Sequence, residues 1–133
     1  RLAVGAPFDD GQGNAATNSG AVYLFSFSDT NFSGATLQGI VGKGYSGGKN
    51  VDVTNLDNGD GFGLSVTLNA SGDRLGVGAP FDDGSGNSGN DFGAVYGFSF
   101  SDTLFSGGTL EAIAGKGYGG GKNRETFHGE SPE

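Results

Sequence analysis

The chain of 133 residues contains no cysteine, methionine or tryptophan, only three prolines and a single histidine. Without cysteine it has neither a disulfide framework nor a cysteine-based metal site. With so little proline it is neither a collagen-like chain nor a proline-rich linker. No apolar run is long enough to cross a bilayer, so direct membrane insertion is not expected.

Basic residues are also scarce, with seven Lys and Arg against 15 Asp and Glu, which gives a net charge of −8. A phosphate-binding surface needs clustered Lys and Arg, so nucleic acid is not an expected partner. The sequence also has few residues that could form a catalytic site. The sole histidine, His128, lies near the end of the chain, and no Ser-His-Asp arrangement is evident. The sequence therefore predicts a protein that is not an enzyme.

Glycine and phenylalanine are what the chain has in quantity, with 29 Gly and 11 Phe beside four Tyr. Disordered chains are poor in aromatic residues, so this composition favours a folded protein. A core of this kind relies on short apolar strands that glycine-rich turns connect.

An internal repeat dominates the sequence. The segment that starts Arg1-Leu-Ala-Val-Gly-Ala-Pro-Phe-Asp-Asp returns as Arg74-Leu-Gly-Val-Gly-Ala-Pro-Phe-Asp-Asp, an offset of 73 residues. Residues 1–50 align on 74–123 without a gap, and about 36 of the 50 positions are identical. Such similarity indicates duplication within a longer array.

Period-2 alternation and turn residues predict four strands in a unit and no helix. The expected strands are about 62–69, 74–79, 94–100 and 109–114. Four antiparallel strands at a fixed period are typical of a β-propeller blade. The predicted fold class is therefore all-β, a fragment of a propeller. A β-solenoid and an array of β-sandwich modules are the alternatives.

The stretch from Phe62-Gly63 to Gly78-Ala79-Pro80, followed by Gly93-Ala-Val-Tyr96, resembles an FG-GAP repeat. That repeat builds the propeller of integrin α subunits and of bacterial haemagglutinin-like and adhesin-like surface proteins. The resemblance implies cell adhesion at an extracellular or bacterial cell-surface location. It implies a protein or glycan ligand, and neighbouring blades or self-association as further partners.

Calcium is the one cofactor candidate, but this chain departs from the family at the usual calcium loop. The connection Asn69-Ala-Ser-Gly-Asp73 is too short and too poor in carboxylates to cage the ion, so Asp73 is expected to be a turn residue. The candidate metal ligands are instead Asp57, Asn58 and Asp60, and the alternative is that these residues form a plain turn.

Acidic pairs recur at one place in each unit, beside glycine-rich loops. Their carboxylates and the nearby amides could hold an ion or hydrogen-bond a sugar, or could cap the loop as Asx turns. The candidate ligand-binding residues are Asp9, Asp10, Asn14, Asp82, Asp83 and Asn87.

The repeat also predicts the boundaries. We expect a partial blade over 1–50 with its second to fourth strands, an inter-blade linker over 51–61, and a second blade over 62–123. Residues 124–133 leave the repeat and are expected to form a disordered tail. The predicted function is a non-catalytic binding or adhesion segment that displays its acidic loops. The alternatives are a purely structural stalk or spacer, and an accessory propeller of an enzyme whose catalytic domain lies elsewhere.

Overall fold

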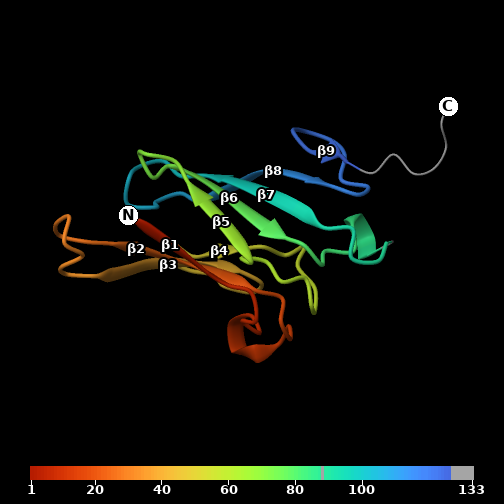
Figure 1. Cartoon of the computed structure of the whole chain (residues 1–133), viewed down its shortest axis with the longest axis horizontal. Coiled ribbons are helices and arrows are strands. Elements are labelled where there is room, and N and C mark those ends of the chain that lie inside the picture. The colour runs from red at the N-terminus through yellow and green to blue at the C-terminus, as the bar shows by residue number, and fades with distance from the viewer. Residues whose placement is uncertain (88, 127–133) are drawn as a thin grey trace.

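The computed structural model describes residues 1–87 and 89–126 as two β-sheets that lie one over the other (Figure 1). The all-β prediction is confirmed. Each sheet takes its strands in chain order. The first sheet consists of β1 (Leu2–Ala6), β2 (Ala21–Ser26), β3 (Thr36–Gly42) and β4 (Val51–Asp52). The second consists of β5 (Ser65–Leu68), β6 (Arg74–Ala79), β7 (Ala94–Ser99), β8 (Thr109–Gly115) and β9 (Arg124–Glu125).

The four antiparallel strands expected in a unit are present in the second sheet as β5 to β8, but each sheet also ends in a short parallel strand that the sequence pattern does not predict. The chain leaves β3, makes a glycine-rich loop and returns beside the same strand. The side chain of Asn50 accepts the Ile40 amide at 2.8 Å, and that of Asp52 accepts the Gly44 amide at 2.7 Å. These bonds hold the returning chain in place, so the expected linker 51–61 begins with a strand.

The second unit makes the same return with a different sequence. Asn123 accepts the Ile113 amide at 2.7 Å, and Glu125 takes the role of Asp52 by accepting the Gly117 amide at 2.7 Å. Arg124–Glu125 therefore pairs as β9, although it lies in the segment expected to be a disordered tail. The rest of that expectation concerns residues 127–133, which lie outside the described part of the chain.

The two repeats share one hydrophobic core, which lies between the sheets. The first sheet contributes Val22, Leu24 and Val41, and the segment between β4 and β5 contributes Val53, Leu56 and Phe62. The second sheet contributes Leu75, Val77, Tyr96, Phe98 and Ile113. All of these side chains are at most 3% exposed, so neither unit has a separate core.

Phe62 joins the two units at the edge of this core. The ring is fully buried and meets Tyr96 and Phe98 edge to face, with centroids 5.3 and 6.0 Å away. Its backbone forms a parallel bridge with Gly20. A Cβ at Gly20 would lie 2.0 Å from the Phe62 carbonyl oxygen, so only glycine permits this approach.

Two short 3₁₀ turns, η1 (Gln12–Asn14) and η2 (Ser85–Asn87), are the helical segments among the described residues. No helix in this part of the chain has the length and apolar character needed to span a membrane. The turn η1 lies in the loop 7–20 between β1 and β2, and η2 lies in the loop 80–93 between β6 and β7. These two loops carry most of the predicted site residues.

Candidate functional site: two tyrosine-anchored loops

Each of the two loops, 7–20 and 80–93, is anchored by the first aspartate of its acidic pair. In the second unit, Asp82 accepts a hydrogen bond of 2.6 Å from the Tyr96 hydroxyl and bonds of 3.0 and 3.2 Å from the Tyr118 hydroxyl. It also accepts the Gly84 amide at 2.8 Å, which closes an Asx turn. The side chain of Asp82 thus ties the loop to β7 and to the segment after β8.

The first unit repeats this arrangement atom for atom. Asp9 accepts the Tyr23 hydroxyl at 2.7 Å, the Tyr45 hydroxyl at 2.8 Å and the Gly11 amide at 2.8 Å. The two sites differ in burial, because Asp82 is 1% exposed whereas Asp9 is only half-buried. The second sheet's aromatic face is covered by the first sheet, while the equivalent face around Tyr23 is open.

The anchoring carboxylates keep these tyrosines in their neutral, donating form. Burial raises the pKa of Tyr96 far above its usual range, and the hydrogen bond to Asp82 adds to the shift. Burial also raises the pKa of Tyr118 to about 12. The hydrogen bond to Asp9 raises the pKa of Tyr23. A phenolate beside a carboxylate would repel it, so the hydroxyl hydrogens stay in place at any physiological pH.

The second aspartate of each pair organises the far side of the loop. Asp10 accepts the Asn18 amide at 2.8 Å, and Asp83 accepts the Asp91 amide at 2.7 Å. Both aspartates remain half-buried, so part of each carboxylate faces solvent. Asn14 and Asn87 are exposed, and their positive φ values of 58° and 55° place them at the ends of the 3₁₀ turns.

The structure thus divides the six predicted ligand-binding residues by role. Asp9 and Asp82 accept tyrosine hydroxyls, and the half-buried Asp10 and Asp83 accept backbone amides. Asn14 and Asn87 are exposed, and Asn87 donates to Asp57. Sequence reasoning missed the four tyrosines, although a signal was present. The chain's only tyrosines form two pairs at the repeat offset, Tyr23 with Tyr96 and Tyr45 with Tyr118.

An exposed phenylalanine precedes each anchor. The Phe8 side chain is 74% exposed and that of Phe81 is 48% exposed. Each follows the proline that ends its strand and precedes the anchored aspartate. The described backbone of each loop is thus hydrogen-bonded to both of its aspartates, while an aromatic ring and the nearby acidic and amide groups face solvent.

The three predicted metal ligands diverge. The Asp57 carboxylate turns toward Asn87, whose amide donates to it at 2.7 Å, and Asn58 is exposed. Asp60 is 1% exposed; one of its oxygens accepts the Asp57 amide at 2.9 Å, and the other has no partner among the described residues. Burial, together with the charges of Asp82, Asp57 and Asp83, raises the pKa of Asp60 to about 7, although the bond from the Asp57 amide acts in the opposite direction.

Metal-binding chemistry has little support elsewhere. Within residues 1–87 and 89–126, no three or more His, Asp or Glu side chains gather where they could hold an ion. Asp73 is the turn residue that the sequence predicts, since its carboxylate accepts Asn69 and Ser71 at 2.8 Å each. Calcium at Asp57, Asn58 and Asp60 stays a prediction.

Comparison with known proteins finds no family model, no curated protein and no solved structure that matches the chain. The interpretation of the two loops therefore rests on their own geometry.

Proposed function

We propose that this chain is a non-catalytic binding segment of a secreted or cell-surface protein, which presents the loops 7–20 and 80–93 to a protein or glycan ligand. One observation carries the proposal. Each loop is fixed by a carboxylate with two tyrosine hydroxyls and a backbone amide, yet it leaves a phenylalanine exposed beside its acidic and amide groups. A rigid loop loses little conformational entropy when it binds a ligand.

The exposed side chains suit a ligand that has both an apolar surface and hydrogen-bonding groups. Phe8 and Phe81 offer ring surfaces, and aromatic residues are enriched at the energetic centres of binding interfaces. Asp10 and Asp83 offer acceptors, Asn14 offers both donors and an acceptor, and Asn87 offers its amide oxygen while its nitrogen donates to Asp57. The same set occurs twice in the chain, which would raise the avidity for a repetitive ligand.

The propeller architecture belongs to this proposal. We propose that the two sheets are neighbouring blades of an FG-GAP-type β-propeller of the integrin-α-like kind, in a bacterial haemagglutinin-like adhesin. The repeat, the meander order of the antiparallel strands and the position of Phe62 between the sheets support it. The parallel β4 and β9 strands are additions that the four-stranded blade does not include.

The test is binding of the purified chain to a glycan array and to immobilised cell-surface protein. Phe81→Ala and Asp83→Ala should reduce binding at least tenfold, while Thr54→Ala, an exposed change outside both loops, should leave it intact. Asp82→Ala is a poor test because it removes the loop's anchor. Circular dichroism should show that each variant keeps the fold.

A purely structural spacer is the second candidate. It is favoured by the internal partners of Asp9 and Asp82, since these carboxylates serve the fold. A spacer would give no saturable binding on any array, and the loop variants would be indistinguishable from the parent chain.

A further inference from the structure

The two sheets have equivalent faces that are used differently. In the second sheet Leu75, Val77, Tyr96, Phe98 and Ile113 form an aromatic face that packs against the first sheet. The counterparts in the first sheet, one repeat offset earlier, are Leu2, Val4, Tyr23, Phe25 and Ile40. These face away from the core, with Leu2 39% and Val4 42% exposed. The first sheet therefore presents an uncovered aromatic face.

On the opposite faces of the two sheets the arrangement is reversed, with the face of the first sheet covered and that of the second sheet open. In the first sheet Ala3, Val22, Leu24 and Val41 form an aliphatic face that is covered by the second sheet. Its counterpart in the second sheet consists of Gly76, Val95, Gly97 and Ala114. This surface is open, and Val95 is 55% exposed. The molecule thus carries, on its two outer surfaces, the repeat counterpart of each half of its own internal interface, with smaller residues on the aliphatic side.

Polar contacts at the rim of the internal interface have counterparts too. Arg1 donates from its guanidinium to the carbonyl and hydroxyl oxygens of Thr103, and Lys49 donates to the Leu104 carbonyl at 2.9 Å. One offset later, Arg74 and Lys122 flank the open aliphatic face. The equivalents of Thr103 and Leu104 are Thr30 and Asn31, which lie in the first unit.

We propose that a second copy of this chain stacks head to tail on the first. The aliphatic face of the second sheet of one copy covers the aromatic face of the first sheet of the next. Arg74 and Lys122 of the first copy then reach the Thr30 and Asn31 segment of the second. Continuity with the internal interface selects this occupant, and the inference does not depend on the ligand of the loops.

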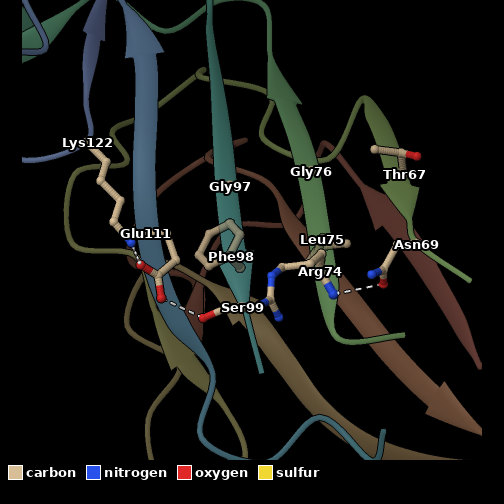
Figure 2. A pocket seen from close by; sticks show the side chains of 10 residues that line it. All are labelled: Thr67, Asn69, Arg74, Leu75, Gly76, Gly97, Phe98, Ser99, Glu111 and Lys122. Atoms are coloured by element: carbon tan, nitrogen blue, oxygen red, sulfur yellow. Dashed lines mark hydrogen bonds and ion pairs between the residues drawn. The ribbon is translucent and has the colours of Figure 1, made fainter. Parts of the chain in front are cut away.

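Two positions weaken the repeated interface. Gly97 stands where the first sheet has Leu24, and Gly76 stands where it has Ala3, so the open aliphatic face is hollow. Figure 2 shows Gly76 and Gly97 in the middle of this hollow, with Arg74 on one side and the linked Ser99, Glu111 and Lys122 on the other. The hollow measures about 530 Å³. A side chain lost from a packed interface costs binding energy, so the wild-type association is expected to be weak.

One of these positions, Gly97, offers a gain-of-function test. A Cβ at Gly97 would meet nothing closer than the Ala112 carbonyl oxygen at 3.8 Å, and the residue's φ is ordinary. Gly97→Leu restores the residue of the internal interface and should be accommodated by the fold. Burying a leucine side chain should strengthen association by about tenfold or more. Sedimentation velocity over a concentration series measures the change.

Mixing two charge variants tests the head-to-tail geometry. Val4→Asp spoils the aromatic face and Val95→Asp spoils the aliphatic face, so each variant alone should be monomeric. A mixture of the two should form a one-to-one dimer that cannot grow, because each variant keeps the face that the other needs. Thr54→Asp adds the same charge outside both faces and should associate like the wild type. Circular dichroism on each variant checks that the fold is retained.

Three results would overturn the proposal. The first is a wild type and a Gly97→Leu variant that both stay monomeric at millimolar concentration. The second is a mixture of Val4→Asp and Val95→Asp that forms no dimer. The third is association that only one of these variants abolishes, since that would indicate a symmetric dimer through a single face.

Discussion

Removal of one tyrosine hydroxyl beside Asp82, and of its equivalent beside Asp9, shows how burial changes the contribution of the same hydrogen bond to stability. Tyr96→Phe and Tyr23→Phe delete equivalent hydrogen bonds, of 2.6 Å to Asp82 and 2.7 Å to Asp9. The aromatic ring stays in both variants, so packing changes little. The two aspartates keep a second tyrosine and a backbone amide in each case.

The expected losses differ because only one carboxylate can recover the bond from water. Asp82 is 1% exposed, so Tyr96→Phe leaves a buried charge short of a donor and should lower the free energy of unfolding by about 2 kcal/mol. Asp9 is half-buried, and water can replace the lost hydroxyl. For Tyr23→Phe we expect about 0.5 kcal/mol.

Urea unfolding at pH 7, followed by tyrosine fluorescence and circular dichroism, gives both values from the midpoints and slopes. Equal losses in the two variants would refute the reasoning, because bonding geometry alone would then set the stability. A loss for Tyr96→Phe smaller than that for Tyr23→Phe would refute it more strongly. Thr54→Ala, exposed and outside both anchors, should unfold like the parent chain.

Three further predictions concern the region between the sheets. The pKa of Asp60 is about 7 in the folded chain, against an ordinary value of 3.8. As the pH rises from 4 to 7, the unfolded chain loses this proton while the folded chain keeps it, so the free energy of unfolding should fall by about 4 kcal/mol. Asp60→Asn should remove most of that fall and be more stable than the parent at pH 8; urea midpoints that fall equally with pH in both chains would contradict this. Phe62→Ala should cost about 4 kcal/mol, since it empties the joint between the sheets, and a loss below that of a surface substitution would show that the ring does not hold them together. Ser19→Ala should be neutral or stabilising by about 1 kcal/mol, because the buried hydroxyl has no partner among the described residues; a thermal melt with a lowered midpoint would imply a partner that the described chain lacks.

The repeat made most of the fold accessible from sequence. Alternation in segments such as 74–79 and 94–100 depends on which residues face the core, and β6 and β7 occupy these places. The short strands β4 and β9 were not predictable in this way. Each has two residues, and side-chain bonds from Asn50, Asp52 and Glu125 hold the returning chain instead of an apolar pattern.

The sequence points to the two loops but not to the different roles of their aspartates. The acidic pairs lie in the loops, yet sequence alone does not show that Asp82 meets Tyr118, which lies 36 residues away. The role of each aspartate is set by its hydrogen-bond partners, since Asp9 and Asp82 make equivalent bonds although only Asp82 is fully buried.

The order of the strands has a consequence for how the chain folds. Among the described residues, every hydrogen-bonded strand pair joins neighbours along the chain, so each sheet can assemble without contacts from the other unit. Pairings such as Leu2 with Phe25 and Arg74 with Ser99 are still non-local, so the sheets should form more slowly than a helical bundle does. The packing of one sheet on the other is the remaining non-local step, and it needs only the two units next to each other. An array built from this repeat could therefore acquire structure progressively, one unit at a time, as it leaves the ribosome.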